Sequence, residues 1–299
     1  MMRQPHADAT LTTPTTGLEI HYRDWDDPTK RISGGAESPP VLLLHGLAST
    51  CRIYDLCAPL LARGRRVVAY DQRGHGESGK PEDGYDMDTL VEDGVGVARA
   101  LGLRAPYTVV GHSWGASVAL RWAVRHPDDV HAAVLVDGGV SSVRDIPDAT
   151  WRTVEERLAP PAWQNVHFDD LLAHTRHGDL AFLDESFRRD FFAALTEPWP
   201  DGTVRARLSA ANHWRILHGL WDDDLDTAYR ALRRPALALL ALPTEPWDNR
   251  RHEMTQTKLR AAERRTILQP LLHVRWLDDT IHDIPLQRPA VLAEAIAET

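Results

Sequence analysis

Short runs of consecutive apolar residues alternate along the chain with longer segments whose apolar positions recur at helical spacing. The apolar runs lack the alternation of apolar and polar residues that marks a strand with one solvent-exposed face. We therefore expect parallel strands that are buried on both faces. The predicted strands are Val41–Leu44, Arg66–Tyr70, Tyr107–Val110, Ala132–Val136, Ala236–Ala241 and His273–Leu277. The predicted helices are Ile53–Ala62, Met87–Leu101, Trp114–His126, Glu253–Ile267 and Pro289–Ala297. This order predicts an α/β fold with a mostly parallel central sheet and helices on both faces.

Two segments depart from this alternation. Leu18–Trp25 alternates apolar and polar residues as an antiparallel edge strand does, and the Gly- and Pro-containing stretch Asp26–Pro40 predicts a turn after it. Between about Ser141 and Arg233 the sequence contains only helical patterns separated by Pro and Gly. We therefore predict a core of residues 1–140 and 234–299, with residues 141–233 inserted as a helical cap.

The predicted cap is rich in aromatic side chains, since it contains all five Phe and five of the ten Trp of the chain. A short helical unit needs large side chains to dock on a main domain, so we expect most of them to be structural. A few are expected to line an apolar pocket, and the candidates for substrate binding are Phe191 and Trp214.

The charge of the chain argues against nucleic acid as a partner. Its formal net charge is −9, whereas phosphate backbones are bound mainly by clustered Lys and Arg. The sequence contains no apolar run long enough to span a bilayer and no secretory signal at its start, so we expect a soluble, cytoplasmic protein without a membrane partner. Cys51 and Cys57 are expected to be reduced, structural thiols.

One serine lies between two glycines in the stretch Gly111-His112-Ser113-Trp114-Gly115. A predicted strand precedes this stretch and a predicted helix follows it, which is the context that a G-x-S-x-G nucleophile turn requires. The glycines leave room for a sharp turn that holds the serine hydroxyl above the edge of the sheet. The alternative is a serine that only caps the following helix.

Three further segments, together with this serine turn, resemble motifs of the α/β-hydrolase superfamily in the family's order. Leu44–Leu47 resembles the H-G oxyanion loop, and Asp71–Ser78 resembles the D-x-R-G-x-G-x-S turn. Asp279–His282, before the last helix, resembles the segment that carries the catalytic histidine. The resemblance covers essentially the whole chain and implies the α/β-hydrolase fold with a helical cap.

The resemblance also implies roles for individual residues. A serine hydroxyl is a weak nucleophile near neutral pH and needs a base, for which His282 is the candidate. The resemblance assigns the oxyanion hole to the backbone N–H groups of Leu47 and Trp114. The side chains of the Asp71–Ser78 turn are expected to hold that turn, and His112 to pack beside the serine.

The acid that would orient His282 departs from the common pattern of the family. Most members carry it after the strand that follows the cap, where this chain offers Glu245 and Asp248 but no glycine. Some members place it after the strand that follows the nucleophile helix, where Asp137 stands. We favour Asp137, with Glu245 as the alternative acid, and Asp137 could also be a turn-capping residue.

These observations predict a cofactor-free serine hydrolase that cleaves a small, fairly apolar carboxylic ester or lactone through an acyl-enzyme on Ser113. No metal site is expected, because the helix that carries His174 and His177 lacks the glutamate of H-E-x-x-H. A serine at the turn differs from the aspartate nucleophile of the family's dehalogenases and epoxide hydrolases. The alternatives are a carbon–carbon bond hydrolase, a thioesterase, or a ligand receptor or non-hydrolytic protein that keeps the triad but turns over poorly.

Overall fold

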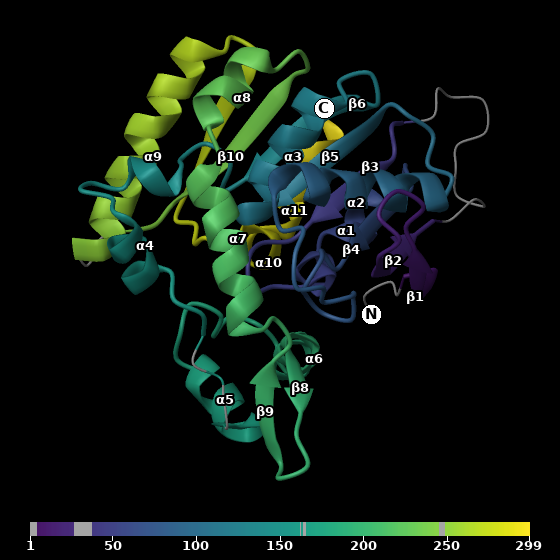
Figure 1. The fold of residues 1–299 in the computed structure, drawn as a ribbon, viewed down its shortest axis with the longest axis vertical. Coiled ribbons are helices and arrows are strands. Elements are labelled where there is room, and N and C mark those ends of the chain that lie inside the picture. Colours follow the sequence, from purple (N-terminus) through teal and green to yellow (C-terminus); the bar gives the residue numbers. More distant parts are fainter. Residues whose placement is uncertain (1–4, 27–37, 162, 164–165, 245–248) are drawn as a thin grey trace.

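The computed structural model describes residues 5–26, 38–161, 163, 166–244 and 249–299 (Figure 1). Its centre is an eight-stranded sheet with the strand order β1-β2-β4-β3-β5-β6-β10-β11. The strands of this sheet are β1 Ala7–Thr12, β2 Glu19–Trp25, β3 Val41–Leu44, β4 Val67–Tyr70, β5 Tyr107–His112, β6 Val130–Val136, β10 Ala236–Leu242 and β11 Leu272–Asp278. The neighbours from β4 to β11 are parallel, and β2 is antiparallel to both β1 and β4. The predicted mostly parallel α/β sheet is confirmed.

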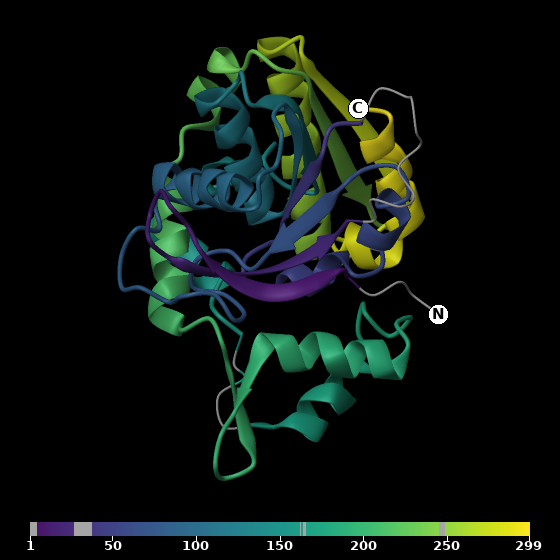
Figure 2. The same ribbon diagram turned by 90° about the vertical axis from the view of Figure 1, so that its right-hand side faces the viewer.

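Helices cover both faces of this sheet (Figures 1 and 2). Those of the main layer are α1 Ala58–Leu61, α2 Met87–Ala100, α3 Trp114–Arg125, α9 Asn249–Leu268, α10 Ile284–Gln287 and α11 Pro289–Ala297. In β3, Leu42 and Leu44 pack in the hydrophobic cluster that includes α2 and α3, whereas Val41 and Leu43 pack in the cluster of α1 and α11. The strand is uniformly apolar because neither face meets water.

Two predicted elements differ from the structure. The strand Leu18–Trp25 is not the edge of the sheet, because β1 pairs with the outer side of β2. The predicted helix Ile53–Ala62 is divided into a 3₁₀ turn, Cys51–Tyr54, and the short α1, whose second residue is Pro59. Proline cannot occupy the interior of a helix, since it lacks an N–H and its ring collides with the preceding turn. Most of the predicted turn Asp26–Pro40 lies outside the described residues.

The segment between β6 and β10 contains strands that the sequence pattern did not predict. It consists of the 3₁₀ turn Val143–Asp145, α4 Trp151–Arg157, β7 Val166–His167, α5 Phe168–Thr175, α6 Glu185–Leu195, β8 Thr196–Pro198, β9 Thr203–Ala206, α7 Ala210–Asp222 and α8 Leu225–Ala231. The three strands form a separate sheet in the order β7-β9-β8. They are two to four residues long, which is too short for a period of two to be recognised. The prediction of a strand-free segment is therefore wrong.

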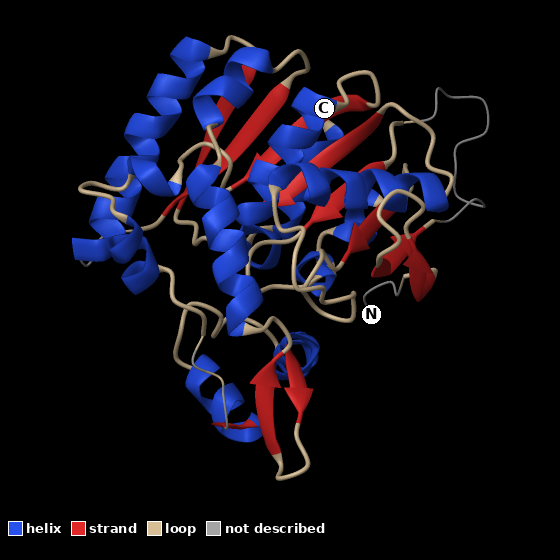
Figure 3. Ribbon diagram, viewed as in Figure 1, coloured by secondary structure: helices blue, strands red, loops and turns tan. Residues whose placement is uncertain are grey.

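The parts of this segment lie at different places on the main layer. Helices α5 and α6 lie with β8 and β9 in a lobe below the large sheet (Figures 1 and 3). Helix α8, by contrast, packs on α3 and α9 of the main layer. The division into a core of residues 1–140 and 234–299 and a cap of residues 141–233 remains a prediction. None of the helices in the described part of the chain has the length and hydrophobicity needed to traverse a bilayer.

Candidate active site

Ser113 forms the turn between β5 and α3, with a φ of 54° and a ψ of −120°. A residue with a side chain rarely adopts a positive φ, because its Cβ then crowds the backbone. The turn is also tight: a Cβ on Gly111 would lie 2.0 Å from the carbonyl oxygen of Gly115. The hydroxyl of Ser113 makes no hydrogen bond to the first turn of α3, so it does not cap the helix. The strained turn instead places Ser113 on the wall of a large cavity.

His282 and Asp137 reach the same cavity from two different loops. His282 lies between β11 and α10, and Asp137 directly follows β6 with a φ of 44°. The Nδ1 atom of His282 lies 2.7 Å from Oδ2 of Asp137. A carboxylate can only accept, so Nδ1 carries the hydrogen and Nε2 of a neutral imidazole is left with a lone pair. This is the protonation that a base acting on a serine hydroxyl needs.

The other oxygen of Asp137 is held by two donors. Oδ1 accepts hydrogen bonds from the backbone N–H of Ala241, at 2.8 Å, and from Nζ of Lys258, at 2.6 Å. The Asp137 side chain is only 2% exposed, and that of Lys258 is 18% exposed. The carboxylate is therefore fixed on both oxygens by groups from β10, α9 and the His282 loop.

The surroundings shift the pKa values of this pair in opposite directions. Burial by itself would raise the pKa of Asp137, but the Lys258 ammonium and the hydrogen bond from His282 outweigh it and hold that pKa well below its ordinary value. Partial desolvation of the His282 ring, whose side chain is 53% exposed, would lower its pKa, but its hydrogen bond to Asp137 and the charge of that carboxylate raise the pKa above the ordinary value. Asp137 is therefore ionised wherever His282 titrates.

The other two candidate acids, Glu245 and Asp248, lie outside the described residues. The structure therefore gives no distance from either carboxylate to His282 that could be compared with that of Asp137. Within the described part of the chain, Asp137 provides the carboxylate that bonds to the His282 ring.

The two backbone N–H groups predicted for the oxyanion hole belong to residues that line the same cavity as Ser113. Among the described residues, neither the N–H of Leu47 nor that of Trp114 donates a hydrogen bond. The loop that carries Leu47 approaches the nucleophile turn closely, because a Cβ on Gly46 would lie 2.9 Å from the Cβ of Ser113. Two backbone donors without a partner among the described residues therefore belong to the wall that also contains the serine, and their role as an oxyanion hole remains a prediction.

Neighbouring side chains hold the loops of the site in place. Arg73 donates to both carboxylate oxygens of Asp93, at 2.8 and 3.0 Å, and its backbone carbonyl accepts from Nδ1 of His75 at 2.9 Å. His112 donates from Nε2 to the carbonyl oxygen of His282, at 2.9 Å. Burial, followed by the charge of the neighbouring His282, lowers the pKa of His112 to about 4. His112 is thus a neutral support of the His282 loop.

The cavity has a volume of about 560 Å³ and is bounded by residues of both the main layer and the segment from β6 to β10. Its apolar wall includes Ile146, Leu158, Leu217 and Leu220. Charged side chains, among them Arg157, Asp223 and Glu253, also line it, and a cavity of this volume is typical of small-molecule sites.

The two aromatic residues predicted to bind substrate do not line this cavity. Phe191 is buried in the cluster formed with α1, α11 and neighbouring aromatic rings. Trp214 packs edge-on against the ring of His213, at a centroid distance of 5.7 Å. Both side chains therefore lie outside the lining of this cavity.

One group of potential metal ligands occurs in the described residues, at His21, Cys51 and Asp71. Nδ1 of His21 is 2.8 Å from Asp71, and its Nε2 is 2.7 Å from Asp8. Asp71 also accepts from the backbone N–H of Cys51. Because both nitrogens of His21 are already bonded to carboxylates, these residues form a hydrogen-bond network. His174, in the pair examined in the sequence, bonds to the carbonyl oxygen of Asp170 in its own helix.

Sequence reasoning missed Lys258. It lies 121 residues from Asp137 along the chain, and a lysine in an amphipathic helix is usually on the solvated face. No local pattern indicates its contact with Asp137, which arises only because α9 packs beside the ends of β6 and β10.

Comparison with known proteins identifies the family. A sequence profile described as "alpha/beta hydrolase fold" matches residues 39–200, more than half of the chain. The chain belongs to the α/β-hydrolase family. This protein of the family has the turn at Ser113, the His282 loop and the sheet order described above.

Individual relatives resemble the α/β-hydrolase chain over different lengths. The 2-hydroxymuconate semialdehyde hydrolase of Pseudomonas sp. (strain CF600) is 32% identical over 201 residues, which cover 61% of this chain and 70% of that protein. The non-heme chloroperoxidase of Streptomyces lividans is 37% identical over 129 residues, but these cover only 42% of this chain and 43% of the relative. The match to the chloroperoxidase thus spans less than half of that protein.

A solved structure shows the same fold over nearly the whole chain. The crystal structure of E-2-(acetamidomethylene)succinate hydrolase superposes with a TM-score of 0.74 and 22% sequence identity, covering 98% of both chains. At this identity the likeness establishes the α/β-hydrolase fold, and the substrate has to be argued from the site itself.

Proposed function

We propose that the protein is a serine hydrolase that cleaves a small, fairly apolar carboxylic ester or lactone. The observation that carries the proposal is the 2.7 Å contact between His282 and Asp137, on the wall of the cavity that also contains the strained Ser113. A nucleophile, a base whose Nε2 is left to accept a proton and a buried carboxylate are the three components that a catalytic triad needs.

In the proposed reaction, Oγ of Ser113 attacks the ester carbonyl carbon and its proton passes to Nε2 of His282. The carbonyl oxygen becomes an oxyanion, which the backbone N–H groups of Leu47 and Trp114 stabilise. The tetrahedral intermediate expels the alcohol, which takes its proton from His282, and an acyl-enzyme remains on Ser113. Water then attacks the acyl carbon with His282 again as the base, which releases the acid and restores the serine.

Asp137 stabilises the imidazolium that forms on His282 in each step, and Lys258 controls how strongly it does so. The Lys258 ammonium fixes the carboxylate at 2.6 Å and offsets part of its negative charge. Without that offset the proton would be held more tightly on His282, and the base would be protonated over a wider pH range. We therefore assign Lys258 as a positioning residue of the triad.

The cavity supports the proposed substrate class. Its volume of about 560 Å³ accommodates a small molecule, and its wall is mainly apolar. The charged side chains at the reacting end are already paired, as Lys258 is with Asp137. An uncharged ester or lactone with an apolar acyl or alcohol part suits this surface best.

Two linked measurements test the proposal. A fluorophosphonate probe is expected to label Ser113 covalently, because an activated serine hydroxyl attacks phosphorus, and Ser113→Ala is expected to abolish labelling. A panel of aryl esters, thioesters and lactones of graded chain length should then be hydrolysed by the wild type and not by Ser113→Ala. Labelling without turnover of any panel member would favour a ligand receptor, and a preference for thioesters would favour a thioesterase.

A further inference from the structure

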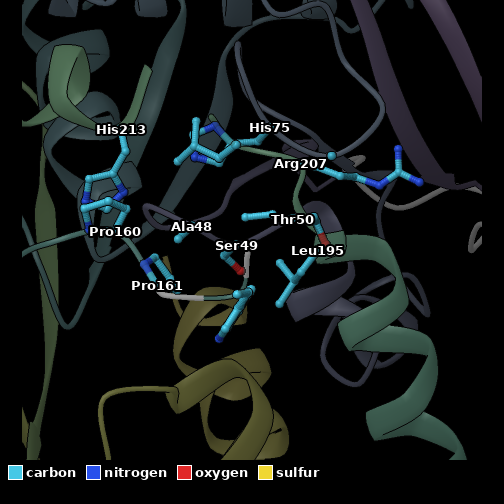
Figure 4. A pocket seen from close by; sticks show the side chains of 13 residues that line it. Ala48, Ser49, Thr50, His75, Pro160, Pro161, Leu195, Arg207 and His213 are labelled. Carbon is cyan, nitrogen blue, oxygen red and sulfur yellow. The ribbon is translucent and has the colours of Figure 1, made fainter. Parts of the chain in front are cut away.

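A second, much smaller cavity adjoins the proposed catalytic one. It has a volume of about 20 Å³ and shares Ala48, Pro161 and His213 with the wall of the larger cavity. Ser49 and His75 approach it from loops of the main layer, and His213 approaches it from α7 (Figure 4). A space of this volume accommodates one water molecule or one group of similar size.

Three buried polar atoms belong to residues lining this small cavity and have no hydrogen-bond partner within the described residues. They are Oγ of Ser49, Nε2 of His75 and Nδ1 of His213. The two histidines are 1% and 4% exposed, respectively. Buried polar atoms are nearly always hydrogen-bonded, so three unsatisfied atoms around one small space indicate a bound group.

Hydrogen bonds on the far side of each ring fix which nitrogen carries the hydrogen. Nδ1 of His75 donates to the carbonyl oxygen of Arg73, and Nε2 of His213 donates to that of Leu158 at 2.7 Å. Burial, followed by the charge of His45, lowers the pKa of His75 to about 3, and burial lowers the pKa of His213. Both rings are therefore neutral, and each of their unsatisfied nitrogens is an acceptor.

The chemistry of the lining narrows the bound group to one class. Two acceptor nitrogens repel the lone pairs of a carboxylate or phosphate. The described residues that line the space include no carboxylate, so an ammonium group buried there would lack a counter-charge. A neutral hydrogen-bond donor remains, such as a hydroxyl, which can donate to one ring and exchange hydrogen bonds with Ser49.

We propose that Ser49, His75 and His213 form a subsite for a hydroxyl group of the substrate, which reaches it from the catalytic cavity beside Ala48 and His213. The inference rests on the proposed function, because it adds a polar group to the otherwise apolar ester or lactone. His213 is then a specificity-determining residue, and a substrate hydroxyl takes the position that water fills in its absence.

The experiment compares matched ethyl esters with and without one hydroxyl. One series carries the hydroxyl at graded positions of the acyl chain and a second carries it in the alcohol part. Acid release is followed by titration. The wild type should prefer the hydroxylated member of at least one pair by about tenfold in kcat/KM, which corresponds to one net hydrogen bond. In His213→Leu this ratio should fall to about one, whatever happens to the absolute rates.

Two further variants separate recognition from folding. His213→Asn keeps an acceptor near the position of Nδ1 and should retain part of the preference. His218→Leu is the matched control on the same helix. The ring of His218 stacks on that of Trp151, with 3.8 Å between the ring centroids, and it lines neither cavity. It should keep the wild-type ratio. If His213→Leu does not fold, Ser49→Ala provides the same ratio test.

The outcomes distinguish the subsite from the proposed function. If the wild type hydrolyses esters but prefers no hydroxylated member, the small cavity holds water only and the subsite is refuted. An equal loss of preference in His218→Leu would also overturn it. If neither series is hydrolysed while Ser113 remains unlabelled by the phosphonate probe, the proposed function itself fails.

Discussion

The two walls of the catalytic cavity are built by different physical means. On the main-layer wall, Ala48, Ser113 and Asp137 all have a positive φ, and the carboxylate of Asp137 is held by three hydrogen bonds. The opposite wall consists largely of apolar side chains such as Leu217 and Leu220 on α7. Directional bonds fix atoms to within fractions of an ångström, whereas apolar contacts only require a shape to be filled.

A third region, the lobe of α5, α6 and the small sheet, is more exposed than the central strands. Strands β5 and β6, which directly precede Ser113 and Asp137, are almost wholly buried. In the lobe of α5, α6 and the small sheet, Phe182 is 50% exposed and Trp199 is 40% exposed. We infer that the chemistry depends on the main layer and that selectivity for the apolar part of the substrate depends on the wall formed by α7.

The sharpest test of this comparison is His282→Ala. Without a base to accept the serine proton, kcat should fall by about 10³-fold or more while the circular dichroism spectrum stays native. Because Ser113 and His282 act as a unit, the double variant His282→Ala with Ser113→Ala should have a kcat only slightly below that of either single variant. A kcat near that of the wild type would show that another residue is the base.

A second large effect is expected for Asp137→Asn. The amide keeps the size of the side chain but loses the charge that stabilises the imidazolium, so kcat should fall by about 10²- to 10⁴-fold. Glu245→Gln is the matched control and should cost little. Thermal stability is measured for both, because a fall in activity that only follows unfolding would indicate a turn-capping role. If the two results are exchanged, Glu245 is the acid.

Lys258→Met should change the pH profile more than the maximal rate. Since His282 acts as a base only when neutral, kcat/KM decreases as the pH falls through its pKa, which Asp137 raises above 6.5. Removing the ammonium leaves Asp137 more negative toward His282, so the acid limb should move to higher pH. Lys258→Arg should restore the wild-type midpoint. An unchanged midpoint in Lys258→Met would restrict Lys258 to a structural role.

The smallest effect is expected on the apolar wall. Leu220→Ala enlarges the cavity and should favour longer acyl chains by a factor of about four per added methylene, which corresponds to about 0.8 kcal/mol. Phe191→Ala, whose ring lies outside the cavity lining, should instead lower the free energy of unfolding by about 3–5 kcal/mol without changing that preference. Chain-length profiles and denaturant curves separate the two. A changed chain-length profile in Phe191→Ala would show that Phe191 contacts the substrate.

Much of this protein could be inferred from the order of residues alone, because the signals were local. Uniformly apolar runs such as Val41–Leu44 indicate strands buried on both faces, and a serine between Gly111 and Gly115 indicates a tight turn between strand and helix. Backbone sterics and burial act on residues that are close in sequence, so they leave readable patterns. The α/β fold and the position of the nucleophile turn followed from them.

Contacts between distant segments were decided only by the tertiary structure. The choice of Asp137 was left open in the sequence, since its contact with His282 joins residues 145 positions apart. The contact of Lys258 and the unsatisfied ring nitrogens of His75 and His213 were not indicated at all. Hydrogen bonds and charges act over a few ångströms, and which side chains come that close depends on how β6, β10, α7 and α9 pack. That packing is a property of the whole chain, so no local stretch encodes it.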